Sequence, residues 1–204
     1  MASRKPKTIA FWCGNLPHWE VEGGRYFVTL HLAGAIPPAG MGRIRRLSQD
    51  LEQLSRTNPE ARLQVQRNIF AEMERWLDRA EHHCYFRIPV VSELVCEALE
   101  HRRGQPWTLY EYVVMRNHLH LFFEFAKSSS LRSSLEQFKR WTGHQAGKHI
   151  DLAGKPFWQD EWFDHWSRSD EEDDRIIAYI RNNPVKAKLV EKYTDWPYGS
   201  WSQK

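Results

Sequence analysis

The run from Val113 to Phe123 constrains the fold of this 204-residue chain more than any other stretch. It is strongly apolar, yet it carries two histidines two positions apart, with one leucine between them. Because strand side chains alternate between faces, His118 and His120 point to one side while Leu119 points to the other. The run therefore predicts a hairpin strand that buries one face in a core and presents two imidazoles on the opposite face.

Two imidazoles side by side on a rigid strand can hold one divalent metal ion. They can equally be two structural histidines that bond ordinary polar partners. The His-x-His pattern of His118 and His120 does not decide between these interpretations, so a second feature of the chain is needed.

The second feature is the stretch Ala178 to Pro184, which contains Tyr179 and Asn183. These two residues are four apart and share one face of a helix, although Pro184 favours a distorted turn at Asn183. The start of this helix is predicted by a capping box, with Ser169 followed by Glu172 among other acidic residues. That acidic cluster could also be taken as a metal site, but the apolar residues that follow at once favour the cap.

A tyrosine beside a metal can act as a nucleophile, although its ordinary pKa of about 10 means that it needs activation. A divalent ion polarises a phosphate, and an amide oxygen from Asn183 would complete a ligand set with His118 and His120. Imidazole with hard oxygen suits Mg²⁺ or Mn²⁺. Tyr179 taken alone is better explained as a tyrosine whose hydroxyl is hydrogen-bonded to a partner.

The remaining elements predict one domain. Residues 1–24 show no hydrophobic period and are expected to form a flexible arm, whereas residues 25–204 are expected to form a single catalytic domain. Strands are predicted over 25–33 and 107–115, and helices from Arg43, after Pro59, from Pro89 and around 131–141.

A basic surface is predicted in the middle of the chain. Between positions 101 and 150 there are eight Arg or Lys residues against three Asp or Glu. The candidates for contacts with DNA phosphates are Arg132, Lys139, Arg140 and Lys148. A solvated basic face is the plain alternative. Of the aromatic residues between positions 157 and 166, most are expected in the core and one or two are available for stacking on unpaired bases.

Cysteine usage and hydropathy bear on the compartment. Cys13, Cys84 and Cys96 form no close-spaced pair, which favours a reducing compartment. No stretch approaches about 18 consecutive apolar residues, so no membrane span is expected. A cytoplasmic protein is predicted.

Together these features resemble a known family. His118-Leu119-His120 is similar to the HUH motif of His, hydrophobic residue and His, and residues 179–187 resemble the helix that bears a single catalytic tyrosine. Supporting stretches are 27–34, 113–118 and 162–165. In order from about Arg25 to Val190, the chain resembles the REP-associated tyrosine transposases, relatives of the small single-tyrosine insertion-sequence transposases. It departs from their usual pattern at Arg116, where proline is common, and at Lys188, where glycine is usual.

The resemblance implies a ferredoxin-like α+β fold of the HUH-endonuclease type, with helices packed on an antiparallel sheet. It implies a transposase-like endonuclease that binds imperfect hairpin DNA and cleaves and rejoins single strands. In that scheme His118, His120 and Asn183 bind Mg²⁺ or Mn²⁺, and Tyr179 attacks the phosphate to form a 5′-phosphotyrosine. The expected partner is single-stranded or hairpin DNA, bound by a monomer or a homodimer.

Two other functions fit the same residues. One is a hairpin-binding protein that keeps the fold without cleaving DNA. The other is a metal-dependent phosphoesterase that forms no covalent intermediate, in which Tyr179 only bonds a partner.

Overall fold

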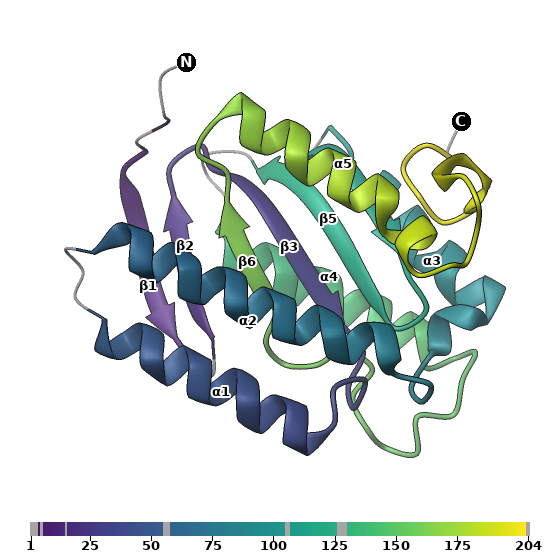
Figure 1. Ribbon diagram of the computed structural model, residues 1–204. Helices are drawn as coiled ribbons and strands as arrows, with labels where there is room; N and C mark the ends of the chain where they lie inside the picture. The colour runs from purple at the N-terminus through teal and green to yellow at the C-terminus, as the bar shows by residue number, and fades with distance from the viewer. Residues whose placement is uncertain are drawn as a thin grey trace.

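A four-stranded antiparallel sheet forms the centre of the computed structural model, which describes residues 4, 6–14, 16–54, 58–104, 107–125 and 130–202. The strand order is β4-β5-β3-β6. Figure 1 shows β5, β3 and β6 side by side. Their bounds are β3 Arg25–His31, β4 Trp107–Val114, β5 His118–Phe125 and β6 Phe163–Trp166. The predicted α+β class and antiparallel sheet are therefore confirmed.

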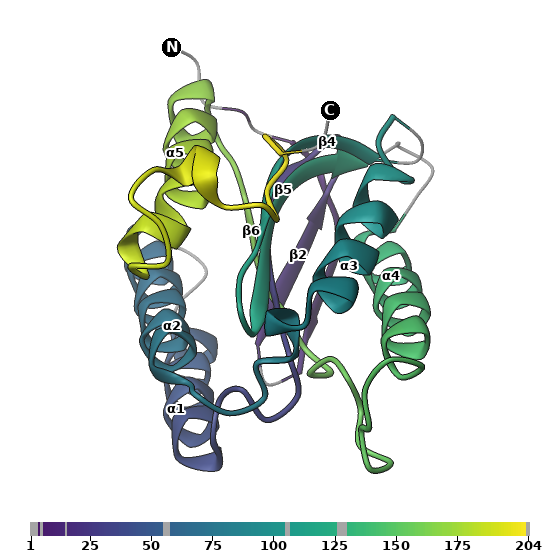
Figure 2. The same cartoon turned by 90° about the vertical axis from the view of Figure 1, so that its right-hand side faces the viewer.

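Helices cover both faces of this sheet (Figure 2). One face carries α3 (Pro89–Glu100) and α4 (Leu131–Ala146), and the path β3-α3-β4-β5-α4-β6 follows the ferredoxin-like order. The other face carries α1 (Pro38–Gln53), α2 (Pro59–Arg79) and α5 (Asp170–Lys186). Short 3₁₀ turns lie at Tyr85–Arg87 and Tyr193–Asp195. Among the described residues, no helix is long and apolar enough to cross a membrane.

The register of the sheet sets which side chains face which helices. His31 lies opposite His118, and Thr29 lies opposite His120. The histidines thus face the layer of α1, α2 and α5, whereas Leu119 and the other alternate residues face α3 and α4. The predicted strand and its two faces are confirmed.

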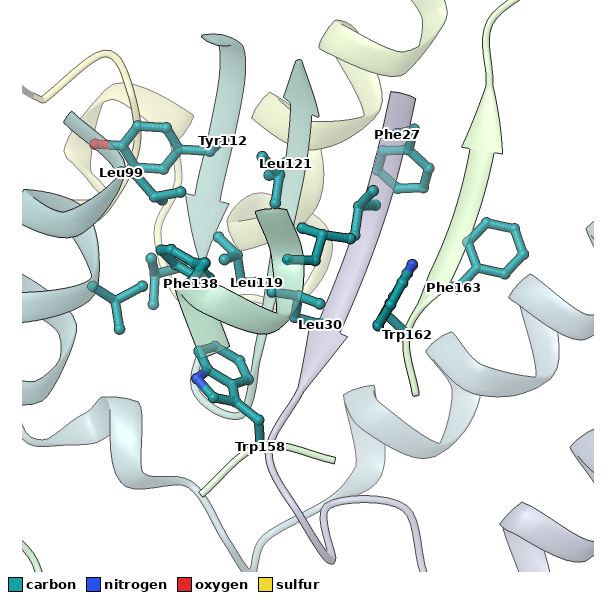
Figure 3. Close-up of a cluster of buried hydrophobic side chains, with 14 of the residues drawn as sticks. Phe27, Leu30, Leu99, Tyr112, Leu119, Leu121, Phe138, Trp158, Trp162 and Phe163 are labelled. Carbon is teal, nitrogen blue, oxygen red and sulfur yellow. The ribbon is translucent and has the colours of Figure 1, made fainter. Parts of the chain in front are cut away.

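The core beneath α3 and α4 is apolar (Figure 3). Phe138 of α4 is fully buried, with its ring 5.7 Å from Trp107 and 6.3 Å from Trp158. The indole of Trp158 donates to the hydroxyl of Thr142 at 2.8 Å. Most of the aromatic segment between 157 and 166 packs in this way, as expected.

Residues 8–13 and 17–21 form a second, two-stranded sheet rather than an arm. β1 (Thr8–Cys13) pairs antiparallel with β2 (Pro17–Val21), so the prediction of an unstructured segment is wrong for these residues. The hairpin is held by residues far away in sequence. His18 bonds Asp164 of β6, and the backbone N–H of Leu16 donates to Glu161 at 2.8 Å. Such long-range contacts leave no local periodicity to read.

Candidate active site between α2, α5 and the sheet

His118 and His120 meet on the sheet face that α2 and α5 cover. Their ring centroids are 4.6 Å apart, and both side chains are almost completely buried. The Nε2 atoms of both rings have no hydrogen-bond partner. Burying a polar atom without a hydrogen-bond partner costs free energy, so two such atoms in one place indicate a binding site.

The protonation of His118 is fixed by its neighbour. The Asn117 amide nitrogen donates to the Leu77 carbonyl of α2 at 2.9 Å, which turns the amide oxygen toward His118. That oxygen lies 2.7 Å from Nδ1 of His118, so Nδ1 must carry the proton and Nε2 keeps its lone pair. Burial and the neighbouring His120 lower the pKa of His118 to about 3, which keeps the ring neutral. A neutral imidazole with a free Nε2 is the form that binds metals.

His120 has a comparable support. Its Nδ1 lies 2.9 Å from the hydroxyl of Thr29 on the adjacent strand, and Thr29 is completely buried. This contact orients the ring, so that Nε2 points away from the sheet toward α2.

Glu74 of α2 completes the cluster, and the sequence analysis did not identify it. Its Oε1 is unpartnered and lies 3.5 Å from Nε2 of His120. One ligand atom from each of Glu74, His118 and His120 lies within 4.8 Å of the other two. Burial raises the pKa of the carboxyl, but the nearby imidazoles of His120 and His118 and the hydrogen bond from Tyr179 outweigh this and hold the pKa below its usual range. Glu74 is therefore a carboxylate.

A signal for Glu74 existed in the sequence. It falls on the stripe of α2 that carries Phe70, Met73 and Leu77, and the structure accordingly leaves its side chain only 4 % exposed. Carboxylates are almost never fully buried without a partner. A glutamate on the apolar face of an amphipathic helix is thus a candidate for a site, even before its partners are known.

Tyr179 of α5 joins this cluster through its hydroxyl, which donates to Oε2 of Glu74. Its ring stands edge-on to His120, with centroids 5.4 Å apart. Burial and the Glu74 carboxylate raise the pKa of Tyr179 far above its ordinary value, whereas the Asn183 amide acts in the opposite direction. The phenol is therefore protonated, and its hydroxyl is bonded to the Glu74 carboxylate.

Asn183 lies one turn after Tyr179, as the spacing predicts. Its side chain is 1 % exposed, and neither its amide oxygen nor its nitrogen has a hydrogen-bond partner. The helix continues through Pro184 to Lys186, so the expected distortion does not end it. Lys188 follows with a φ of +55°, the left-handed conformation that glycine adopts easily.

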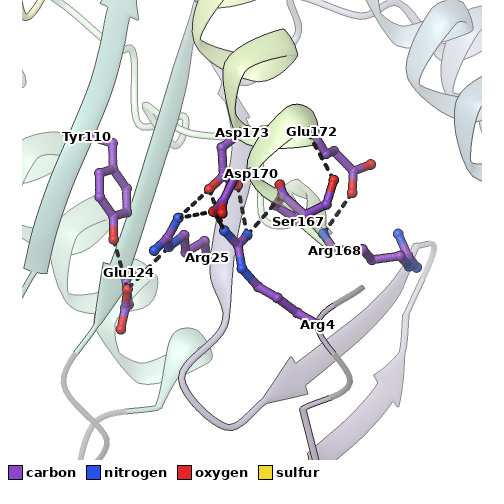
Figure 4. A network of polar contacts seen from close by, with 10 residues as sticks. Arg4, Arg25, Tyr110, Glu124, Ser167, Arg168, Asp170, Glu172 and Asp173 are labelled. Carbon is purple, nitrogen blue, oxygen red and sulfur yellow. Dashed lines mark hydrogen bonds and ion pairs between the residues drawn. The ribbon is translucent and has the colours of Figure 1, made fainter. Parts of the chain in front are cut away.

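Ion pairs fix the position of α5, and with it that of Tyr179. Ser169 caps the helix and accepts from the backbone N–H of Glu172 at 3.2 Å, as the capping box predicts. Asp173 of its first turn binds Arg4 and Arg25, as Figure 4 shows. Farther along, Arg181 binds the buried Glu111 of β4 at 2.6 Å. The acidic cluster thus serves the helix and its anchoring.

These residues fit a divalent metal ion. Two imidazole nitrogens and a carboxylate oxygen converge without hydrogen-bond partners, and the Asn183 amide, which also has none, lies beside Tyr179. Nitrogen with hard oxygen donors suits several divalent ions, Mg²⁺ and Mn²⁺ included. No thiol takes part in the group, which differs from thiolate-rich structural zinc sites.

The four cations predicted to bind DNA lie away from this cluster. Arg132, Lys139 and Arg140 belong to α4, and Lys148 follows that helix, so all four lie on the opposite side of the sheet (Figure 2). Arg132 binds Glu136 at 2.9 Å, and Lys148 donates to Gln145 at 2.8 Å. The Lys139 ammonium donates to the Asp160 carbonyl, and burial lowers its pKa. Arg140 is exposed.

Sequence comparisons agree with this arrangement. Residues 89–183 match the family described as IS200-like transposases, a range that includes His118, His120, Tyr179 and Asn183. The REP-associated tyrosine transposase of Escherichia coli (strain K12) is 25 % identical over 101 residues, which is 49 % of this chain. The match covers 58 % of that relative's length.

A solved structure shares the fold. It is a REP-associated tyrosine transposase bound to a REP hairpin, with a TM-score of 0.54 and 17 % identity. The match covers 90 % of this chain and 80 % of the other. The resemblance predicted from the sequence is thereby confirmed: residues 89–183 match the IS200-like transposases, and the chain is similar to REP-associated tyrosine transposases in sequence and fold.

Proposed function

We propose that this protein is a single-strand DNA endonuclease and strand transferase that acts beside hairpin DNA through a 5′-phosphotyrosine. The observation that carries the proposal is the juxtaposition of the partly buried Tyr179 hydroxyl with Glu74, His118 and His120, three residues whose free ligand atoms converge. The similarity to hairpin-associated tyrosine transposases supports DNA as the substrate. Such an enzyme acts where DNA is, in line with the expected cytoplasmic location.

In this proposal His118, His120 and Glu74 hold a divalent ion, with Asn183 as the further ligand expected from the sequence. The ion, Mg²⁺ or Mn²⁺, would supply Lewis-acid polarisation of the scissile phosphate. Asn117 and Thr29 orient the two imidazoles from behind, as outer partners of metal ligands commonly do.

Tyr179 is the nucleophile in this scheme. Its phenolic oxygen attacks phosphorus, the bond from phosphorus to the 3′ oxygen breaks, and the phosphate becomes esterified to the tyrosine. The phenolic proton passes to Oε2 of Glu74, which already accepts its hydrogen bond. The departing 3′ oxygen takes a proton from water. The new phosphotyrosine ester conserves the bond, so a free 3′-OH can reverse the reaction and rejoin strands.

The direct test is a covalent adduct. Hairpin DNA with an unpaired flank, labelled on the 3′ side of the cut, is incubated with Mn²⁺ and run on a denaturing gel. The wild type should give a slow labelled band and Tyr179→Phe none, because only the hydroxyl is removed. Tyr193→Phe serves as the matched control and should keep the band. An adduct that survives in Tyr179→Phe would place the nucleophile elsewhere.

Hydrolysis without an adduct is the second candidate. One observation favours it: the Tyr179 hydroxyl donates a hydrogen bond to Glu74, and buried tyrosines with a purely structural role commonly make such a bond. In that case water attacks the phosphate and Tyr179 only orients Glu74. Cleavage by the wild type with no labelled adduct would select this alternative, whereas binding without cleavage would select a silent hairpin-binding protein.

DNA binding through Arg132, Lys139, Arg140 and Lys148 is a separate part of the proposal. Since these residues lie across the sheet from Tyr179, the hairpin stem and the cleaved flank would contact different faces. Replacement of Arg140 by alanine should weaken binding uniformly across sequences and reduce the salt slope by about 1 if it contacts a phosphate. An unchanged slope would remove Arg140 from the interface.

A further inference from the structure

A recess opens beside Tyr179, between α2 and α5, on the side away from Lys186. It has a volume of about 250 Å³. Its walls are aromatic: Phe70 lies 5.5 Å from Tyr179, 5.4 Å from Phe27 and 5.0 Å from Phe163, measured between ring centroids. Pockets for drug-sized ligands begin at roughly 300 Å³, so this recess suits a smaller, flat group.

The rim of the recess is polar and positively charged. Arg67 of α2 and Arg175 of α5 line it and are exposed, while the amide of Gln66, 9 % exposed, belongs to its wall. The acidic member of the lining, Glu172, is already engaged by His165 at 2.9 Å and by the backbone of Arg168 at 2.7 Å. The rim is thus suited to an anion and the interior to a flat apolar face.

A second hollow adjoins the first, and Phe70 and Tyr179 line both. This neighbour is strongly charged and contains Glu74 of the candidate metal cluster. Its other charged members are Arg75, Asp78, Arg79 and Lys186. Phe70 and Tyr179 therefore separate an aromatic compartment from a charged one at the position of the phenol.

We propose that the recess binds one unstacked nucleobase of the strand that is cut, next to the scissile phosphate. This inference rests on the proposed function, since it names what the site holds beside Tyr179. A base offers a flat π-face for the adjacent rings of Phe70 and Phe163 and a polar edge for Gln66. Its own sugar-phosphate would leave across the rim, past Arg67 and Arg175. The scissile phosphate would then lie on the charged side, where the Tyr179 hydroxyl meets Glu74.

The experiment is an abasic scan of the flank beside a hairpin. Affinity is measured by fluorescence anisotropy in EDTA, so that no metal-dependent cleavage intervenes. For the wild type, removal of one base should lower affinity by about tenfold at a single position, because stacking contributes on that scale. Fluorescent 2-aminopurine at that position should be quenched on binding. A scan without a sensitive position would overturn the proposal.

A filled recess sharpens the test. Ile176→Trp places an indole in the space, so it should weaken binding of intact DNA by the same factor and abolish the difference between intact and abasic DNA. Val90→Trp adds the same ring to an exposed site on α3 and should retain the wild-type pattern. If Ile176→Trp does not fold, Arg67→Ala replaces it. In that variant, removal of the base should lower the affinity less than it does in the wild type. Equal abasic losses in wild type and filled variant contradict the assignment.

The two proposals fail differently. If the phosphotyrosine adduct forms normally but no abasic position lowers the affinity, only the base-pocket proposal is rejected. If one abasic position lowers the affinity in Tyr179→Phe as well, and the wild type forms no adduct, the covalent mechanism is rejected and the base-pocket proposal stands.

Discussion

The two faces of the central sheet bury different kinds of side chain. The face under α3 and α4 is packed with apolar side chains such as Leu119 and Phe138, both completely buried. The face under α2 and α5 instead buries His118, His120 and Glu74, whose ligand atoms have no hydrogen-bond partner. Among the residues that the structure describes, this is the one place where three metal-ligating side chains converge.

Strand β5 therefore carries residues for stability on one face and residues of the candidate site on the other. Each unsatisfied buried polar atom costs on the order of 1–3 kcal/mol, so the histidine face is destabilising by itself. Leu119, between the two histidines, packs into the opposite face and helps to offset that cost.

Loss of a histidine should abolish metal binding. His120→Ala or His118→Ala removes a ligand, so affinity for Mn²⁺ should fall at least about a hundredfold, beyond what outer partners contribute. Added Mn²⁺ should no longer raise the Tm, since a ligand stabilises only the state that binds it. His149→Ala, at an exposed histidine after α4, is the control and should keep the shift. A full shift in His120→Ala would refute the metal assignment.

Loss of an aromatic ring on the other face should have the reverse pattern. Phe138→Ala should lower the free energy of unfolding by about 3–5 kcal/mol, because a large buried side chain is removed. Affinity for Mn²⁺, measured by calorimetry on the folded protein, should stay the same. Trp141→Ala, at a side chain of the same helix that is 46 % exposed, should change stability by no more than about 0.5 kcal/mol. A weaker metal site in Phe138→Ala would mean that the two faces are coupled.

The outer partner of His120 should have an intermediate effect. Thr29→Val keeps the shape but removes the hydroxyl that bonds Nδ1, so affinity for Mn²⁺ should drop by about 10–100-fold. Thr108→Val, at an exposed position of β4, is the matched control. If Thr29→Val binds Mn²⁺ as tightly as the wild type, the hydroxyl does not orient the ring.

Stability of the metal-free protein should fall in mild acid. The pKa of His118 is about 3 when folded, below its ordinary value of 6.5. As pH drops below 6.5 the unfolded chain takes up a proton that the folded chain refuses, so the free energy of unfolding falls toward pH 3. One such group contributes about 1.4 kcal/mol per pH unit. His118→Asn should reduce the slope measured by urea unfolding in EDTA between pH 6 and 4.5. His31, with a pKa of about 4, adds a similar slope that the variant keeps.

The fold was largely readable from the sequence where signals are local. The alternation around His118, the cap at Ser169 and the spacing of Tyr179 and Asn183 each act within a few residues. The strand pair β1 and β2 was missed because it depends on docking against residues more than a hundred positions later.

The candidate site was readable only in part for the same reason. Tyr179 and the histidines follow from two short motifs, but Glu74 reaches them only when α2 packs across the sheet. Its role depends on a contact with a residue 105 positions away, which no local period encodes.

Helix α2 holds more than one part of the site. It supplies Glu74, and one turn later the Leu77 carbonyl that turns the Asn117 amide and thereby decides which nitrogen of His118 carries the proton. A helix that slid by a single hydrogen bond would withdraw the carboxylate and release the tautomer in the same movement. We therefore expect the metal cluster to form completely or not at all. The imidazole NMR resonances of His118 should report which of the two states is present.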